Sequence, residues 1–236
     1  MSNITMSLSK QTVDTLKKVY EVNQGIKFVE GDKTLKVKST DNTLLMHAPI
    51  EEEFPRDFYV YNLREFLSVL SIIEDPLLDF SDDKFMVVTS KDGKQRLRYS
   101  ESDPQFVTSY TDKEPRIPSV EYTVDVSAEQ FASVMKAAQT MRLEFVGFVC
   151  DGNTVSLTAF NKNNGDQGTT NNFAIEMIDH DTKFEMFYKL GSQNIGVLLG
   201  EGDMTFEVSE KKISKVSTKS GKTFWIAMNA NSKYGE

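Results

Sequence analysis

The chain contains the same hairpin-like pattern twice, about half its length apart. Residues 89–99 read TSKDGKQRLRY and residues 217–226 read STKSGKTFWI, so each has a lysine, a small polar residue, a glycine and a second lysine before a strand-like run. Asp92-Gly93 in the first copy is typical of a tight two-residue turn in which both central residues have positive φ. A chain that carries this pattern twice is expected to fold as two similar units.

An ordered series of further matches supports the repeat. Amphipathic helices are predicted over 8–23 and 126–142, with N-caps at Ser9 and Ser127 and with Lys18 matching Lys136. Each is followed by short strands, by a segment that begins extended and turns helical, and by a further strand pair. The order is therefore present twice at an offset of about 118 to 128 positions. It predicts an α+β protein of two tandem similar domains, each with two helices packed on antiparallel sheets.

The segment between the copies, ESDPQFVTSYTDKEPRIPSVE, sets the expected domain boundaries. It holds three of the six prolines and shows no helical periodicity, which is typical of a connector. We expect an N-terminal domain over 1–100, a connector over 101–121 and a C-terminal domain over 122–236. Each domain then has a usual size for a single hydrophobic core.

Composition excludes several classes of protein. The single cysteine, Cys150, cannot form an internal disulfide, and the start MSNITMSLSKQ does not have the pattern of a signal peptide. No apolar run approaches the length of a membrane span, so we expect a protein of a reducing compartment with no membrane partner. The formal net charge of −8 argues against a surface that grips nucleic acid everywhere, but it allows a localised basic lining.

The sequence contains no recognisable catalytic constellation. His47 ends an apolar run and is expected to pack, whereas His180 lies between two aspartates at a spacing that matches no tight metal site. The run Glu51-Glu52-Glu53 is interpreted as a solvated acidic loop, and no Walker, nucleophile-elbow or zincin motif is present. We therefore expect no enzyme activity, no catalytic residues, no metal and no cofactor.

The repeated order resembles that of a DNA sliding clamp, and more closely that of the DNA polymerase clamp, or processivity factor, of T-even-type tailed bacteriophages. In that family an opening helix leads to a strand that starts Gly-Ile, and an aromatic strand runs into Asn/Asp-Leu-x-x-Phe-Leu. The residues here that match these two motifs are Gly25, Ile26, Asn62, Leu63, Phe66 and Leu67. The resemblance covers both halves, is stronger in the first, and contains no catalytic signature.

The resemblance implies a DNA-clamp fold that assembles as a ring of three chains, a homotrimer whose helices line a hole around double-stranded DNA. Helices in such a place should carry Lys or Arg on their exposed faces. The candidate DNA-facing residues are Lys10, Lys17, Lys18, Arg64, Lys136, Arg142 and Lys189. Acidic residues are mixed among them, and this small positive excess suits a ring that surrounds DNA of any sequence without holding it.

The resemblance also implies partners, namely the replicative DNA polymerase, a clamp loader and late transcription factors, in the cytoplasm of the host cell during viral DNA replication. In the family, a pocket near the connector and the C-terminal strand takes short apolar peptides. The candidate pocket residues are Phe106, Val107, Ile117, Phe224, Ile226 and Met228, the last three of which fit equally well as inward-facing core. Residues 171–178 are the candidate edge strand of the second half, and a strand beside the connector is that of the first.

Three functions remain open on the sequence. The first is a non-enzymatic processivity clamp, and the second is a duplicated-domain phage structural or assembly ring, which would not need exposed lysines facing a lumen. The third is an enzyme with a cleft between its two halves, for which the sequence offers no catalytic constellation. The exposed lysines on the first helices favour the clamp.

Overall fold

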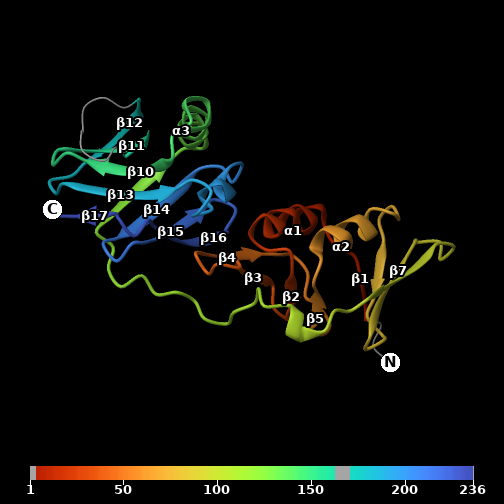
Figure 1. The fold of residues 1–236 in the computed structure, drawn as a ribbon. Helices are drawn as coiled ribbons and strands as arrows, with labels where there is room; N and C mark the ends of the chain where they lie inside the picture. The colour runs from red at the N-terminus through yellow and green to blue at the C-terminus, as the bar shows by residue number, and fades with distance from the viewer. Residues whose placement is uncertain (1–3, 163–170, 236) are drawn as a thin grey trace. The chain divides into compact units, whose positions relative to one another are not determined.

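The computed structural model describes residues 4–162 and 171–235, and the chain divides into two compact units, Met1–Glu114 and Pro115–Glu236 (Figure 1). The division between the units falls inside the segment 101–121 that the prolines marked as a connector. Each unit has its own hydrophobic core.

The first unit contains two α-helices among its described residues. In chain order its elements are β1 (Thr5–Met6), α1 (Lys10–Val22), β2 (Ile26–Phe28), β3 (Thr34–Lys38), β4 (Leu44–Pro49), β5 (Phe58–Val60), α2 (Leu63–Leu70), β6 (Leu77–Asp79), β7 (Phe85–Thr89), β8 (Arg96–Ser100) and the short 3-10 helix η1 (Pro104–Phe106).

The second unit contains one α-helix among its described residues. Its elements are β9 (Tyr122–Val126), α3 (Ala128–Met141), β10 (Phe145–Cys150), β11 (Thr154–Phe160), β12 (Phe173–Asp179), β13 (Phe184–Lys189), the 3-10 helix η2 (Ile195–Leu198), β14 (Met204–Ser209), β15 (Ile213–Thr218), β16 (Thr223–Ala227) and β17 (Lys233–Tyr234). Up to β16 this order repeats that of β1 to β8 with its helices, so the predicted tandem repeat and α+β fold are confirmed.

The sheets are antiparallel throughout the named strands. In the first unit the strands pair in the order β1-β6-β7-β8, β2 pairs with β5, and β3 pairs with β4. In the second unit the orders are β12-β11-β10-β13-β17 and β9-β14-β15-β16. β8 and β12 therefore each end a sheet. The edge strand predicted over 171–178 is formed by β12, Phe173–Asp179.

Serine caps start the first helix of each unit, as predicted. The Ser9 hydroxyl accepts a hydrogen bond from the Thr12 amide at 3.1 Å. The Ser127 hydroxyl accepts one from the Gln130 amide at 3.1 Å, and the Gln130 side chain accepts one from the Ser127 amide at 2.9 Å, which completes a capping box. These bonds satisfy amides that a helix start otherwise leaves unpaired.

Glu52 has a structural role that the sequence interpretation missed. Its carboxylate accepts hydrogen bonds from the Ser9 amide and from the Thr12 hydroxyl at the start of α1. The description of 51–53 as a solvated acidic loop was therefore wrong for Glu52, because a carboxylate at a helix N-terminus is stabilised by the unpaired amides and by the helix dipole.

Each core is built around phenylalanines. In the first unit the rings of Phe28 and Phe54 stack with centroids 4.0 Å apart, and Phe58 and Phe80 meet edge to face at 5.3 Å. In the second unit Phe148 and Phe206 lie edge to face at 5.2 Å. These rings are at most 1% exposed, so each unit is held together by a dense aromatic core.

The fourth predicted helix is not formed as an α-helix. Residues 184–203 form strand β13, which includes Lys189, and then only the four-residue 3-10 helix η2. Gly191 and Gly200 flank η2 with φ of +83° each, and Gly196 lies inside it. Gly196 disfavours a longer helix because glycine in a helix interior carries a conformational-entropy cost. Gly191 and Gly200, with their positive φ, stop the helix on both sides.

The turn at Asp92-Gly93 also differs from the expected two-residue type. Gly93 has φ of +71°, but Asp92 is not among the described residues with positive φ. The Ser90 amide donates to the Gln95 carbonyl at 3.1 Å, which closes a loop of four residues. The Asp92 carboxylate accepts a bond from the Lys94 amide at 3.1 Å, and this side-chain bond replaces the tighter turn.

Gly147 lies in the middle of β10, where β13 approaches closely. A Cβ atom at this position would lie 2.3 Å from the Met186 carbonyl oxygen and 2.4 Å from the Phe187 Cα. Both are backbone atoms, so the sheet itself requires glycine here.

None of the helices in the described part of the chain combines the length and apolar character that a membrane crossing needs.

Candidate nucleic-acid interface

The predicted DNA-facing cations lie on the helices of both units and at the end of one strand. α1 carries Lys10, Lys17 and Lys18, and α2 carries Arg64. The remaining three are Lys136 on α3, Arg142 directly after it, and Lys189 at the end of β13. The side chain of Lys18 is only 14% exposed, which makes it the most enclosed cation of α1.

On α1 two of the cations are paired with carboxylates of the same helix. Lys17 lies 2.7 Å from Asp14, and Lys18 lies 2.9 Å from Glu21. Both pairs have the i,i+3 spacing that brings side chains together on a helix surface. The face of α1 that carries Lys17 and Lys18 is therefore nearly neutral.

On α3 the surroundings are different. Lys136 and Arg142 both line a groove of about 730 Å³ between the second half of α3 and the segment that contains η2. Its other lining residues are Ala132, Met135, Ala138, Gln139, Leu143, Glu144, Leu190, Gly191, Gln193, Asn194, Gly196 and Leu199. The groove thus has two cations, three side-chain amides and a single carboxylate over an apolar floor.

Arg142 is held away from the helix by its backbone. It is the C-cap of α3, with φ of +53° and ψ of +47°, in the left-handed region that few residues other than glycine adopt. Its amide still closes the helix on the Gln139 carbonyl at 3.4 Å. The guanidinium therefore leaves the end of the helix beside the groove rather than continuing the helical row of side chains.

The predicted peptide-pocket residues are divided between the two units. Phe106 is 61% exposed in the first unit, and Val107 beside it is buried. In the second unit Ile117 is half-buried, whereas Phe224, Ile226 and Met228 are 0%, 0% and 5% exposed. The last three lie inside the second unit's own core.

Tyr61 is an exposed aromatic residue that sequence reasoning did not single out. It is 57% exposed, and its ring meets that of Phe106 edge to face with centroids 6.5 Å apart. The Tyr61 amide donates to the Ser102 hydroxyl at 3.0 Å, which ties this position to the chain leaving β8. Two large exposed rings in contact form an apolar patch of the kind that anchors a short peptide.

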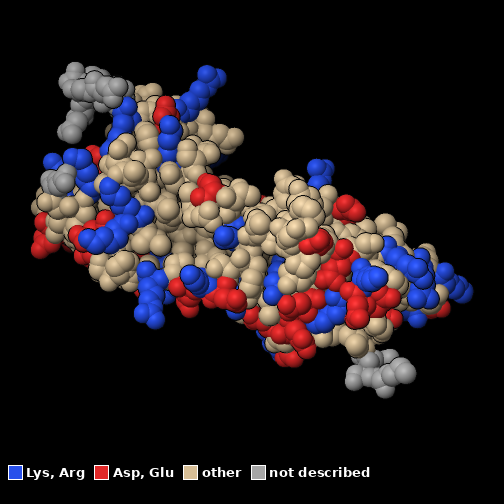
Figure 2. All heavy atoms as spheres, turned by 60° about the horizontal axis from the view of Figure 1, so that its bottom comes forward, with Lys and Arg blue, Asp and Glu red and all other residues tan. Residues whose placement is uncertain are grey.

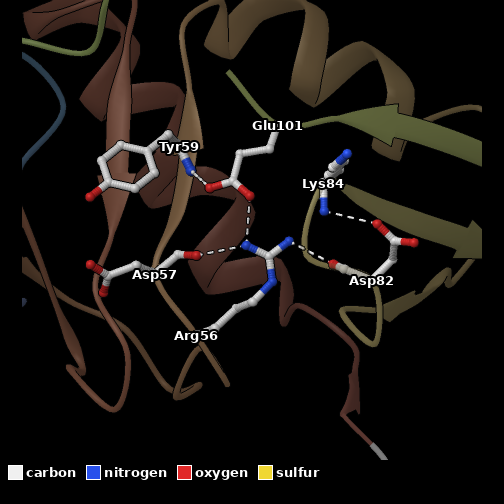
Figure 3. A network of polar contacts seen from close by, with 6 residues as sticks. All are labelled: Arg56, Asp57, Tyr59, Asp82, Lys84 and Glu101. Carbon is white, nitrogen blue, oxygen red and sulfur yellow. Dashed lines mark hydrogen bonds and ion pairs between the residues drawn. The ribbon is translucent and has the colours of Figure 1, made fainter. Parts of the chain in front are cut away.

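A polar network fixes the chain that leaves β8 (Figure 3). The Arg56 guanidinium donates to Glu101 at 2.6 Å, to the Asp57 carbonyl at 2.8 Å and to the Asp82 carbonyl at 3.0 Å. Glu101 in turn accepts a bond from the Tyr59 amide at 3.2 Å. The arginine and glutamate side chains are only 20% and 14% exposed, so this fork joins three segments in a partly buried setting.

A second anchor holds the following residues. The Lys27 ammonium lies 2.8 Å from Asp57 and 4.9 Å from the centre of the Tyr110 ring. The hydrogen bond to Asp57 raises the pKa of Lys27, although partial burial opposes this. Burial alone would raise the pKa of Asp57, but bonds from the Lys27 side chain and the Glu30 amide keep it below the usual value.

The β7–β8 hairpin carries a basic patch that was not predicted as a site. Lys91, Lys94, Arg96 and Arg98 are all exposed, and Figure 2 shows basic side chains gathered at this end of the first unit. Arg98 lies over the Phe85 ring at 4.7 Å. On β12, at the edge of its own sheet, the exposed charged residues are Glu176 and Asp179.

The histidines lie in structural settings. The His180 ring accepts a bond from the Thr182 amide at 3.1 Å, within a tight turn. His47 is half-buried on β4, and burial lowers its pKa despite the opposing charge of Glu114. Among the residues that the structure describes, no group of three or more His, Cys, Asp or Glu side chains could hold a metal ion.

Comparison with curated proteins finds relatives over nearly the whole chain. The chain is 30% identical to the sliding clamp of Vibrio phage KVP40 over 194 residues, which cover 80% of this chain and 86% of that protein. It is 20% identical to the sliding clamp of Escherichia phage RB69 over 229 residues, 97% of this chain and 99% of that one. The sliding clamp of Enterobacteria phage T4 is 21% identical over 176 residues, 75% and 76% of the two chains.

Solved structures share the fold. The proliferating cellular nuclear antigen of Entamoeba histolytica matches with a TM-score of 0.68 at 10% identity, over 97% of this chain and 100% of that one. The A. fulgidus protein of the same name, bound to the C-terminal region of FEN-1, matches with a TM-score of 0.64 at 15% identity, over 99% and 100%. No protein-family model matches the chain.

Proposed function

This chain belongs to the sliding-clamp family found in tailed phages, and from that premise we propose that it is a clamp that encircles duplex DNA and tethers the replicative DNA polymerase. The observation that carries the proposal is the match to phage sliding clamps along almost the whole chain, on a fold that is written twice. A clamp of this kind gives processive viral DNA replication through topology, so it needs no catalytic site and no cofactor. We propose that it has neither.

We propose that three chains close the ring, with β8 of one copy facing β12 of the next. Each of these strands ends a sheet and leaves backbone groups open to a further strand. Their exposed charges are complementary, since β8 presents Arg96 and Arg98 and β12 presents Glu176 and Asp179. Head-to-tail contacts between unlike surfaces close a ring when the rotation per copy is right.

We propose that the Tyr61–Phe106 patch of the first unit takes part in partner docking, with Val107 of the expected pocket directly beside Phe106 in the chain. The exposure and contact of the two rings support this choice. Phe224, Ile226 and Met228 are left out of this docking surface, because their side chains are buried. The proposed partners are the replicative DNA polymerase, the clamp loader and late transcription factors, and the proposed location is the cytoplasm of the infected host cell.

The structural-ring alternative is less well supported, because the curated relatives along this chain are named sliding clamps. Two measurements test the clamp. Light scattering across a dilution series should give about 80 kDa, three times the 26.7 kDa chain. Primer extension with the cognate polymerase and loader should become processive when the chain is added. A monomer at every concentration, or a ring without any effect on extension, would contradict the proposal.

A further inference from the structure

The repeat places one lysine at the same point of the first helix in each unit. Ser9 and Ser127 start α1 and α3 with equivalent hydrogen bonds, so the two helices can be aligned from their caps. This alignment puts Lys18 over Lys136, nine positions after the cap in both helices. The two lysines are therefore a matched pair within one chain.

The acidic partners of α1 are absent from α3. Counting from the caps, Asp14 and Glu21 of α1 correspond to Ala132 and Gln139 of α3. Lys18 is paired with Glu21 at 2.9 Å, whereas Lys136 forms no ion pair with any residue that the structure describes. The charge of Lys18 on α1 is thus compensated, whereas Lys136 on α3 is exposed and its charge is uncompensated.

The missing fourth helix adds a hollow beside this lysine. In the first unit α2 packs against α1, and the cavity between them is about 220 Å³ and mostly apolar. In the second unit η2 has only four residues, and the groove is about 730 Å³. Arg142 lines the same groove and, like Lys136, has no ion pair within residues 4–162 and 171–235.

We infer that the groove between α3 and η2 is the seat of one sugar-phosphate strand of duplex DNA, and that Lys136 and Arg142 contribute more to phosphate binding than Lys17 and Lys18 do. The inference rests on the proposed function. An unpaired cation releases counterions when it meets a phosphate, whereas a lysine that is already paired must first leave its carboxylate. The side-chain amides of Gln139 and Gln193 add uncharged donors for phosphate oxygens. On α1, Lys17 and Lys18 face the duplex with their charges already compensated by Asp14 and Glu21.

The test is the salt dependence of binding to a short blunt duplex, followed by fluorescence anisotropy of the labelled DNA. Lys136→Gln and Arg142→Gln should each reduce the slope of log K against log salt by about 0.9 for every phosphate that the side chain neutralises in the wild type. Lys17→Gln and Lys18→Gln should leave the slope nearly unchanged. Lys84→Gln, an exposed lysine just before β7, controls for the removal of one positive charge elsewhere.

The repeat supplies a second, reciprocal pair of variants. Gln139→Glu introduces in α3 the acid that α1 has, and it should weaken DNA binding about as much as Lys136→Gln. Glu21→Gln removes the acid from α1, frees Lys18, and should raise the slope. The inference is wrong if Gln139→Glu has no effect on DNA binding. It is also wrong if substitution of Lys17 or Lys18 reduces the slope more than substitution of Lys136 or Arg142 does.

The outcome is separable from that of the proposed function. For every variant and for the wild-type chain, the mass in solution is measured by light scattering and the stimulation of the polymerase is assayed. A wild type that neither forms a ring nor stimulates extension contradicts the clamp itself. A wild type that does both, with α3 variants whose DNA slope is unchanged, contradicts only the groove. Loss of binding to an acidic peptide of the polymerase in those variants, with the DNA slope intact, would reassign the groove to a protein partner.

Discussion

The ammonium group of Lys219 lies 2.6 Å from a carboxylate oxygen of Asp203. Lys91 and Asp75 form the same pair at 2.9 Å, and both of their numbers are 128 lower (91 against 219, and 75 against 203). In each unit the pair joins the turn of a β-hairpin to the segment before the preceding strand. The repeated Lys-x-Gly-Lys pattern is therefore explained by a contact within the fold rather than by a ligand.

The second lysine of the pattern, Lys222, should contribute more to stability than the first, Lys219. Lys222 pairs with Glu201 at 2.8 Å, and the two side chains are only 16% and 3% exposed. Lys222→Gln should lower the free energy of unfolding by about 2–3 kcal/mol, because the largely buried carboxylate of Glu201 loses the opposite charge of Lys222. Urea denaturation measures the change. Lys219→Gln is the matched control and should leave the midpoint unchanged, since both of its groups are well exposed.

Arg56 should not be replaceable by lysine. Its guanidinium bonds to three segments at once, and an ammonium group cannot reproduce that fork. We expect Arg56→Lys to cost roughly 2 kcal/mol of stability, measured by thermal or urea unfolding. Arg64→Lys, on the exposed face of α2, is the control with the same change of side chain. Equal stability of the two variants would show that the network does not hold the chain after β8.

The ring should depend on opposite charges at its edges. Glu176→Lys on β12 and Arg96→Glu on β8 should each raise the dissociation constant of the ring by about tenfold, and the double variant should recover part of the loss. Mass measured against concentration and salt follows the effect. Glu210→Lys, an exposed acid in the turn between β14 and β15, is the control. A mass unaffected by either reversal would remove β8 and β12 from the interface.

Partner binding should depend on Phe106 more than stability does. Because this ring is 61% exposed, Phe106→Ala should hardly change the melting temperature. We expect it to weaken binding of a polymerase-derived apolar peptide by about tenfold, as for an anchor residue. Ile72→Ala, which removes a side chain that is 64% exposed on the same unit, is the control. A variant that lacks Met228 and the residues after it would not test partner binding separately from stability. Met228 is buried, and the Ser232 hydroxyl accepts a hydrogen bond from the Phe187 amide.

His47 should make the first unit less stable in mild acid. Burial lowers its pKa, so the unfolded chain takes up the proton before the folded chain does. Stability from this residue is therefore complete above the unfolded pKa of about 6.5 and declines as the pH falls through the window below it. The nearby Glu114 and Asp32 act against the shift and Lys36 adds to it. His47→Gln should give a melting temperature that varies less between about pH 7.5 and 5.5.

The repeat and the order of elements could be predicted from sequence, because local signals mark them. Ser9 and Ser127 cap helices whose apolar residues recur at helical spacing, and both caps form as expected. The fourth helix could not be predicted in the same way. Its apolar residues resemble those of the first copy, but Gly191, Gly196 and Gly200 decide the outcome, and their effect depends on φ values that the pattern does not reveal.

The candidate site was predictable as residue types but not as surroundings. The lysines of α1 and α3 look alike in sequence, and only the structure shows that Lys18 is paired and Lys136 lines a groove. Tyr61 was missed because its contact with Phe106 joins positions 45 residues apart. The alternation in β16 left two interpretations open, and burial decides for core at Phe224 and Ile226.

Gly147 sets a limit on variation that is independent of DNA and of any partner. A methyl group there would meet the backbone of β13 rather than a side chain that could turn aside. In a library of all single substitutions selected for viral growth, the variants at position 147 should therefore show how well a virus grows when this chain does not fold. Substitutions that fall to this level have failed to fold, and those between it and the wild type are the ones that report on loading, sliding or docking.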